Sequence, residues 1–162
     1  GADGTLFVAD TGNSRVGVIS AAGELTAHFG STLGDGLLEP KGIAALRDGS
    51  LAVTDRHHRV HILKRDGTAV RSFKIPQTGA FGESQEHALA ESPDGGLAVA
   101  DPEAHRVRLF GPDRKPKGWI GRATAGDRVE EFVHPMDVAY RPDGGLAVVD
   151  ATRGLVLVLR LP

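Results

Sequence analysis

The feature of this sequence that most constrains its fold is an eight-residue segment that occurs four times. Each copy begins with an Asp-Gly pair, continues through Leu and a valine-containing apolar stretch, and closes on an aspartate. The copies span residues 3–10, 48–55, 94–101 and 143–150. Their closing aspartates are 45, 46 and 49 residues apart. A repeat of this length that is rich in short strands indicates a series of small packed sheets rather than a helical solenoid.

The second repeat is complete and shows what one unit contains. Its apolar segments 42–46, 51–54, 60–63 and 69–73 are separated by turn or loop residues, including two Asp-Gly pairs suited to tight hairpins. The second segment is a continuous apolar run, as expected of a strand buried on both faces, whereas the fourth alternates like a half-exposed strand. We therefore expect a four-stranded antiparallel meander, which is the blade of a β-propeller.

The same pattern runs through the whole chain and predicts an all-β fold with a single β-propeller segment over residues 1–162. The four expected blades cover about residues 1–30, 40–74, 86–121 and 135–162. The first blade lacks its inner strand and the last lacks its outer strand, so we expect three, four, four and three strands. The apolar segment 155–159 has no following outer strand, and an open apolar edge of this kind invites pairing. We therefore expect an open or partial ring that belongs to a larger propeller, with a closed four-bladed monomer as the alternative.

Several motifs of the chain resemble those of a known family. Residues 10–16 match the Asp-x-x-Asn-x-Arg-Val signature of NHL repeats, and residues 40–44 and 135–139 match the start of that repeat. The resemblance covers essentially the whole chain. It departs from the family pattern in the loop 55–59, which is one residue short, and at Ala104 and Arg153, which stand at the Asn position. The resemblance implies an NHL-repeat β-propeller, a family that forms closed rings of about six blades.

Aspartate and arginine recur at equivalent positions of the repeats. Recurrence in blade after blade indicates a structural pair that ties the loops, rather than a single binding site. We expect the aspartates of the first three repeats to be buried and hydrogen-bonded to loop backbone or to a nearby arginine. The structural repeat residues are Asp10, Arg15, Asp55, Arg59, Asp101, Arg106 and Asp150.

A meander places its loops at two ends. The turns between first and second strands and between third and fourth strands are tight and leave little room for chemistry. The other end, called here the long-loop end, carries the loops between second and third strands and the long segments 30–39, 77–86 and 122–134. Binding residues gather on such loops. The candidates for a ligand face are His57, His58, Glu86, His87, His105 and His134; Glu83, Glu103, Asp127, Glu130 and Glu131 share this end.

Some propeller enzymes that are similar to this family hold a metal on the ring axis, with histidine and carboxylate ligands from the starts of inner strands. Glu86, His87, His134 and Asp137 occupy such positions here. Imidazole with carboxylate suits Zn, Mn or Fe, and carboxylate with carbonyl suits Ca. However, no ligand pattern repeats between blades, and there is no HExxH or EF-hand spacing. We therefore favour solvated loop residues over a metal site for these side chains.

Composition narrows the range of functions. The formal net charge of −2 gives no bulk attraction to nucleic acid or to anionic membranes. The single Trp and single Tyr, with an acidic long-loop end, argue against RNA binding by stacking. The absence of Cys excludes disulfides and thiolate sites, and no GxSxG elbow occurs. No targeting segment or membrane-spanning apolar run is found, and because Met is missing at position 1 we expect the chain to begin within a longer product. The compartment stays open.

Two hypotheses for function follow. The first is a non-catalytic scaffold without a cofactor that recognises a protein, peptide or small ligand through the long-loop end. The second is part of a metal-dependent propeller lyase or hydrolase, with Glu86, His87 and His134 near the ring axis and a Ca or Zn ion. In either case, we expect the isolated chain to self-associate or to pair with propeller blades from another chain.

Overall fold

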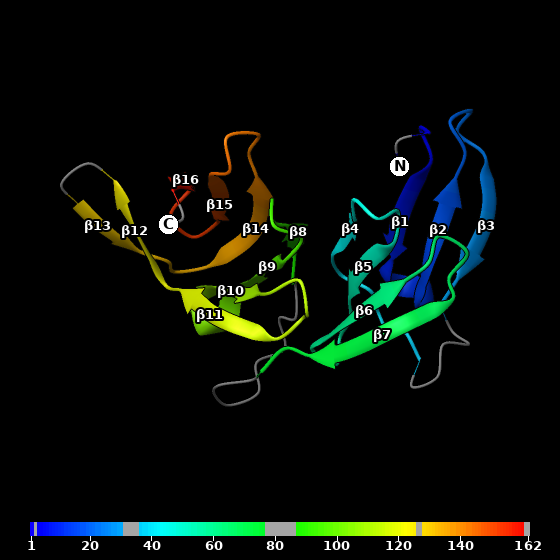
Figure 1. Cartoon of the computed structure of the whole chain (residues 1–162), viewed down its shortest axis with the longest axis horizontal. Helices are drawn as coiled ribbons and strands as arrows, with labels where there is room; N and C mark the ends of the chain where they lie inside the picture. The colour runs from blue at the N-terminus through cyan, green and yellow to red at the C-terminus, as the bar shows by residue number, and fades with distance from the viewer. Residues whose placement is uncertain (2, 31–35, 77–86, 126–127, 161–162) are drawn as a thin grey trace. The chain divides into compact units, whose positions relative to one another are not determined.

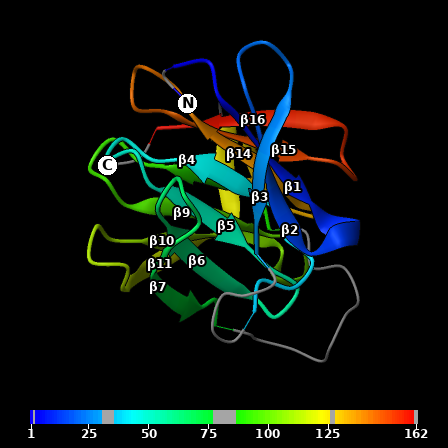
Figure 2. The ribbon, with the colours of Figure 1, turned by 90° about the vertical axis from the view of Figure 1, so that its right-hand side faces the viewer.

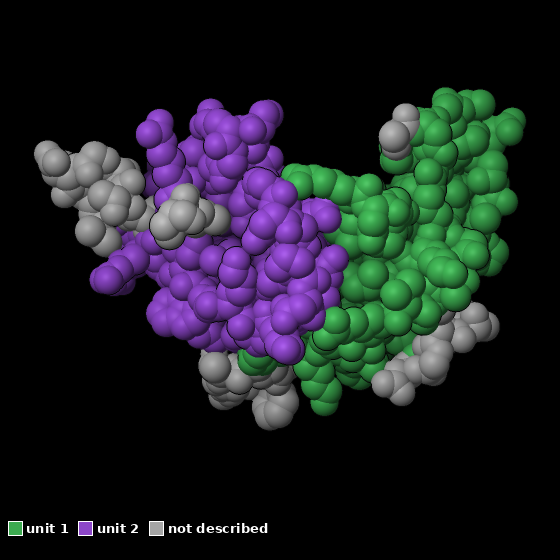
Figure 3. Space-filling model, viewed as in Figure 1, with its two compact units in different colours: residues 1–77 green, residues 78–162 purple. Residues whose placement is uncertain are grey.

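The structure is a computed structural model that describes residues 1, 3–30, 36–76, 87–125 and 128–160 (Figure 1). The fold is all-β, with short antiparallel sheets and two single-turn 3₁₀ helices. By its internal contacts the chain divides into two compact units, Gly1–Gln77 and Thr78–Pro162, which Figure 3 colours separately. Among the described residues, no helix has the length and apolar character needed to cross a membrane.

Unit 1 contains two antiparallel meanders. Blade 1 has the sheet order β1-β2-β3, with β1 at Leu6–Asp10, β2 at Arg15–Ile19 and β3 at Leu25–Phe29. The 3₁₀ helix η1, Thr11–Asn13, joins β1 to β2. Blade 2 has the order β4-β5-β6-β7, formed by Ile43–Ala45, Leu51–Thr54, Arg59–Leu63 and Ala69–Lys74. Figure 2 views the chain from the side on which β3 lies.

Unit 2 contains two further meanders and a hairpin. Blade 3 has strands β8 to β11, which are Leu89–Glu91, Leu97–Asp101, Arg106–Phe110 and Pro116–Ile120, with η2 at Pro102–Ala104. Blade 4 has the order β14-β15-β16, formed by Pro135–Tyr140, Leu146–Asp150 and Leu155–Leu159. The expected pattern of three, four, four and three strands is therefore confirmed.

The segment 122–134 was expected to be irregular, and this expectation is wrong. Strands β12 (Arg122–Ala125) and β13 (Arg128–Glu131) pair antiparallel as a two-stranded hairpin between blades 3 and 4 of the chain order. The sequence does hold the signal for it, since two short runs are separated by the two residues Gly-Asp. That spacing is a hairpin signature. Long connections in a repeat protein can thus form structure of their own.

The tight turns of the meanders all close in the same way. In the turn after β4, the Leu46 carbonyl accepts from the Gly49 N–H at 3.0 Å, and the Leu46 N–H donates to the Ser50 carbonyl at 2.8 Å. Five equivalent turns of the described residues repeat this pair of bonds. Gly49 has φ +84°, and glycine occupies this left-handed position in every such turn except one, where Arg114 has φ +64°. The Asp-Gly pairs were therefore read correctly as turn chemistry.

The cores lie between neighbouring blades within each unit. In unit 1, Leu51, Val53 and Leu63 of blade 2 pack with Val16 of blade 1, with Phe7 and Phe29 alongside. In unit 2, Leu146, Val148, Leu157 and Leu159 of blade 4 pack with Ala98, Ala100 and Val107 of blade 3. The second strands were expected to be among the most buried segments; 51–53 and 97–99 are fully buried, and in 146–148 only Ala147 is half-buried.

Candidate functional site

The loops that join second to third strands share one backbone plan. In each, the residue just before the third strand has a left-handed conformation, and its N–H donates to the carbonyl three residues earlier. The four residues are Ser14, His58, His105 and Gly154, with φ of 49°, 54°, 52° and 63°. The aspartate that ends each second strand stands at the start of this loop. These loops therefore end in the same backbone conformation in all four blades, whereas their side chains differ.

Asp55 is the best-bonded of the repeated aspartates. It is completely buried and accepts hydrogen bonds from the backbone N–H groups of His57 and Arg59 at 2.9 and 3.0 Å. The Nε2 atom of His61 lies 2.8 Å from its second carboxylate oxygen, and the Arg59 Nε lies 3.4 Å from the same oxygen. Burial raises the pKa of Asp55, but the bonds from His61 and Arg59 and their charges outweigh it, and the net pKa is lowered. The carboxylate therefore ties loop to strand in its ionised form.

Asp101 is also buried, but its nearest partner differs from the expected one. The Arg108 Nε donates to the Asp101 carboxylate at 2.6 Å, whereas the Nε of the expected partner, Arg106, lies 3.5 Å away. Arg108 sits on β10 opposite Val99, the position that His61 occupies opposite Val53 in blade 2. The third strand thus supplies a second partner whose identity changes from blade to blade.

The aspartates of the first and fourth repeats, Asp10 and Asp150, have other hydrogen-bond partners. Asp10 was expected to be buried, and this is wrong, because about 30% of its side chain is exposed. It still accepts hydrogen bonds from Asn13 and Arg15, at 2.9 and 2.7 Å. Asp150 is fully buried and accepts the backbone N–H groups of Val133 and His134, at 2.7 and 3.2 Å. The carboxylates of both aspartates therefore already accept hydrogen bonds from their own loop or from neighbouring backbone.

The histidine candidates lie at the long-loop end and differ in exposure. In unit 1, His57 is exposed and His58 is half-buried at its left-handed position. In unit 2, His105 is exposed, and its Nδ1 contacts the Val133 carbonyl. His134 is half-buried, and its backbone N–H bonds Asp150. Glu83, Glu86 and Asp127 lie outside the described residues.

The described part of the chain does not assemble the metal ligands that its sequence suggested. No three His, Asp or Glu side chains among these residues gather closely enough to hold an ion. His87 is buried, and its Nδ1 lies 2.8 Å from the Ala100 carbonyl, so that nitrogen donates to the backbone and is not open to a metal. Asp137 is exposed and accepts the N–H of Val138. His87, His134 and Asp137 therefore do not form an ion site by themselves, and Glu86 lies outside the described residues.

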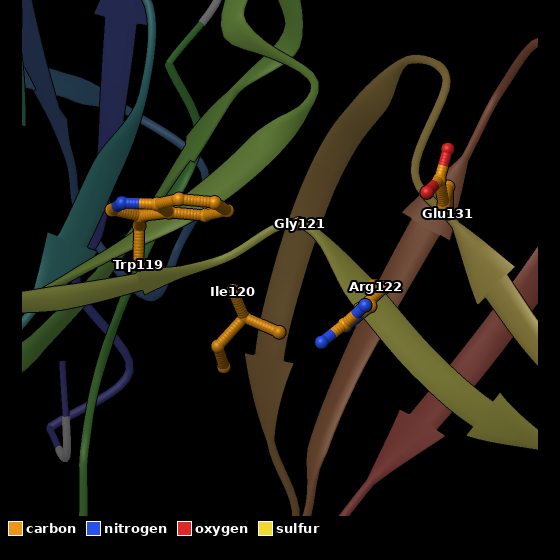
Figure 4. A pocket seen from close by; sticks show the side chains of 5 residues that line it. All are labelled: Trp119, Ile120, Gly121, Arg122 and Glu131. Carbon is orange, nitrogen blue, oxygen red and sulfur yellow. The ribbon is translucent and has the colours of Figure 1, made fainter.

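A hollow of about 580 Å³ opens in unit 2 where blade 3 leads into the hairpin. It is lined by Trp119, Ile120, Gly121, Arg122 and Glu131 (Figure 4). The indole and the two charged side chains come from three different strands. Arg122 of β12 stands opposite Glu131 of β13 in the strand register. A flat aromatic surface beside one cation and one anion can bind an amphipathic ligand by stacking and by ion pairs at once.

Two neighbours hold the indole of Trp119 in place. The Arg106 guanidinium lies 5.5 Å from the ring centroid, within the range of a cation–π contact. Gly121 lies against the ring, because a Cβ atom at that position would be 2.8 Å from the Trp119 Cζ3 atom. Even so, 61% of Trp119 is exposed. A large, braced and exposed aromatic side chain is characteristic of a recognition surface.

Unit 2 also has a hollow of about 530 Å³ at its tight-turn end, where no room was expected. Leu97, Leu109, Phe110, Ile120 and Tyr140 form its apolar lining, and Ser92, Asp94 and Lys117 add polar groups. Burial raises the pKa of Tyr140, assisted by the charge of Asp94 and opposed by a Ser92 hydrogen bond. Bonds from Ser92, Gly96 and Lys117 lower the pKa of Asp94 to about 2. The charges at this hollow are thus already paired.

Sequence reasoning missed both hollows. Tight turns gave no sign of the second one, since it forms between the side chains of two blades rather than within a loop. For the first, a signal existed: Trp119 is the only Trp of the chain, at the end of an outer strand and two residues before Gly121. The histidines drew attention because their chemistry is versatile, whereas the Trp stood in a segment read as structural.

Comparison with known proteins identifies the fold. The chain is similar to the virginiamycin B lyase of Staphylococcus aureus, with 16% identity and a TM-score of 0.68 over 99% of this chain and 53% of the lyase. It is also similar to the WD40 β-propeller domain of Doa1, at 13% identity and a TM-score of 0.70 over 99% of this chain and 48% of that one. A putative gluconolactonase shares 16% identity and a TM-score of 0.68, over 99% of this chain and 57% of its own.

These comparisons show a β-propeller fold and do not separate its families. No protein-family profile matches the chain. No curated protein matches it either. The chain spans about half the length of the solved structures that it matches. Because identity is low and the neighbours differ in activity, the likeness supports a propeller scaffold and leaves the function to the residues of this chain.

Proposed function

We propose that this chain is an NHL-like propeller segment that serves as a non-catalytic recognition scaffold and binds a peptide at its long-loop end. The contacts of the signature residues support the NHL assignment. Asp10 bonds both Asn13, at 2.9 Å, and Arg15, at 2.7 Å, within a single loop. These are the residues that the family signature requires, and their mutual bonding gives that spacing a physical reason.

The observation that carries the recognition function is the hollow at Trp119. It combines an exposed indole with the positive charge of Arg122 and the negative charge of Glu131. A peptide offers apolar side chains and both signs of charge along one chain, so it can satisfy all three groups together. The hollow's volume of about 580 Å³ is within the range for ligand pockets, roughly 300–1,000 Å³.

The alternative, part of a metal-dependent lyase or hydrolase, receives less support from the described residues. It requires Glu86, His87 and His134 around one ion, and among the described residues no three His, Asp or Glu side chains gather closely enough to hold one. The neighbours include a lyase and a putative gluconolactonase, but low identity confines that likeness to fold. The recognition hypothesis uses side chains that are exposed and already positioned.

A peptide library tests the proposal, because the only Trp of the chain lies in the hollow. A phage-displayed library of random peptides is panned on the immobilised chain, and enriched peptides are synthesised and titrated against it. We expect these peptides to change the intrinsic fluorescence of Trp119. Trp119→Ala should weaken binding by about 30-fold or more, as measured by calorimetry, because a central aromatic anchor contributes about 2 kcal/mol or more.

Matched variants locate the site. Arg122→Ala and Glu131→Ala should each weaken the binding of peptides of opposite local charge by roughly 1.5- to 5-fold, since exposed ion pairs contribute modestly. Leu25→Ala removes a similarly exposed apolar side chain in unit 1 and should leave binding unchanged. If no peptide is enriched, or if enriched peptides bind Trp119→Ala as well as the unsubstituted chain, this proposal is wrong.

A further inference from the structure

Each blade has two distinct faces, and the structure shows how they meet. The aspartate face of a blade is the side of the sheet on which the closing Asp of the second strand lies. It also carries the alternate residues of that strand and their partners on the neighbouring strands. The opposite face carries the remaining strand residues. In unit 1, Leu51, Val53 and Leu63 on the aspartate face of blade 2 cover Val16 on the opposite face of blade 1. Unit 2 repeats the arrangement, since the aspartate face of blade 4 covers the opposite face of blade 3. In both units, therefore, the aspartate face of the later blade packs on the opposite face of the earlier blade.

The aspartate face of blade 1 is left uncovered. Strand pairing places Leu6 opposite Ile19, as Leu51 stands opposite Leu63 in blade 2. Leu51 and Leu63 are 1% and 0% exposed, whereas Leu6 is 58% exposed. Leu25, which pairs with Ile19 on the same face, is 59% exposed. An apolar surface that is core in one repeat is therefore solvent-facing in another.

The opposite face of blade 4 is uncovered in the same way. Val156 pairs with Val149, and Val158 pairs with Ala147, on this face. Val156 is 64% exposed, although its equivalent in blade 3, Val107, is fully buried in the core. Exposed contiguous apolar strands of this kind mark interaction surfaces. The two uncovered surfaces are the same pair of faces that pack on one another inside each unit.

We propose that a second copy of this chain covers these surfaces head to tail, with the aspartate face of blade 1 in one copy on the opposite face of blade 4 in the other. Each copy carries both complementary surfaces, so no other partner is needed. The contact is heterologous, which allows closed rings or longer chains of copies. The proposal is independent of peptide binding at Trp119, which lies on blade 3.

A polar feature supports this choice of occupant. The Asp10–Arg15 pair lies on the uncovered face, with both side chains about 30% exposed, while the equivalent Asp55–Arg59 pair of blade 2 is 0% and 13% exposed. Asp10 and Arg15 already neutralise each other at 2.7 Å. A blade surface can therefore cover the pair, as the equivalent pair of blade 2 is covered, without leaving an unpaired charge.

Sedimentation velocity with charged variants tests the head-to-tail contact. The unsubstituted chain should sediment at twice 17.0 kDa or more at micromolar concentration. Leu6→Glu blocks one surface and Val156→Glu blocks the other, so each variant alone should remain near 17.0 kDa, with association weakened about 100-fold or more. When the two are mixed, each still has one intact surface, and they should form a 1:1 pair. Val70→Glu, at a similarly exposed position of β7, is the control and should associate normally.

Each other outcome overturns the proposal. A chain that stays at 17.0 kDa at all concentrations instead closes its two surfaces on each other or leaves them bare. If Leu6→Glu still associates, the copies pair through another surface, such as the β16 edge. If both variants are monomeric but do not pair on mixing, blade 1 of one copy does not dock on blade 4 of the other. Leu25→Glu and Val158→Glu repeat the test should circular dichroism show either first variant unfolded.

Discussion

Replacing Asp55 with alanine should destabilise the chain by about 3.5 kcal/mol. The substitution leaves two backbone N–H groups, of His57 and Arg59, without the fully buried carboxylate that accepts their hydrogen bonds. Each such orphan costs roughly 1 kcal/mol at the low end of the measured range, and the lost bond from His61 adds about 1.5 kcal/mol because it joins a charged group. The Arg59 guanidinium also loses its counter-ion at 3.4 Å.

Asp10→Ala is the matched control, because it removes the same residue of the same motif from an exposed setting. Its bonds to Asn13 and Arg15 can be replaced by water, so its effect should be clearly smaller than that of Asp55→Ala. Urea unfolding followed by far-ultraviolet circular dichroism gives both values, at one fixed protein concentration below the range in which copies associate and cover Asp10. Equal losses for the two variants, or a loss below about 1 kcal/mol for Asp55→Ala, would refute the argument from burial.

Acid should remove the contribution of Asp55. Its pKa in the folded chain is lowered from the ordinary value of 3.8, so the folded state favours the carboxylate. The stabilisation is therefore fully present above that ordinary value and is lost as the pH falls through the folded pKa. The difference in unfolding free energy between the unsubstituted chain and Asp55→Ala should shrink below about pH 4. A difference that stays constant down to pH 2 would show that Asp55 acts without its charge.

Three glycine substitutions give further tests. Gly67→Ala should cost about 3 kcal/mol in urea unfolding, because φ is +86° and a Cβ would be 2.4 Å from Phe29 Cγ; Gly49→Ala, with φ +84° and nothing within 4 Å, should cost only about 1 kcal/mol. Equal costs would mean that Phe29 moves aside freely. Gly121→Ala should displace the indole of Trp119 and shift its emission maximum with little change in the unfolding midpoint. An unchanged spectrum would contradict the close packing at Gly121.

The repeat made the fold predictable from the sequence. A fixed spacing of Asp-Gly turns and apolar runs determines meanders by local rules, and these rules hold in all four blades. The hairpin at β12 and β13 was missed because no counterpart of it occurs in the described parts of the other repeats. The exposure of Asp10 was also missed, since its local sequence is the strongest match to the motif; its burial depends on what covers the sheet, which no local pattern contains.

Tertiary partners were the least predictable feature of the aspartates. The third-strand position opposite the central valine of the second strand holds Gly17, His61, Arg108 and Leu157 in the four blades. Only His61 and Arg108 can bond the aspartate, and neither belongs to the repeated motif. Strand pairing brings them to the carboxylate from six or seven residues away. The sequence motif predicted Arg106 instead. Arg106 and Arg108 lie on the same face of β10, and the motif alone does not distinguish which of them lies closer to Asp101.

The contrast between repeated and unique residues also indicates where recognition resides. Repeated polar residues, such as Asp55 and Asp150, have their bonding capacity taken up by loops and strands, so they offer little to a ligand. Trp119, Arg122 and Glu131 occur at one place only, and their exposed surfaces face a hollow. A scaffold of equivalent blades gains specificity where its symmetry is broken, because only there can one ligand find one site. The hairpin is the largest such break in the described residues, and it supplies two of the three groups at the Trp119 hollow.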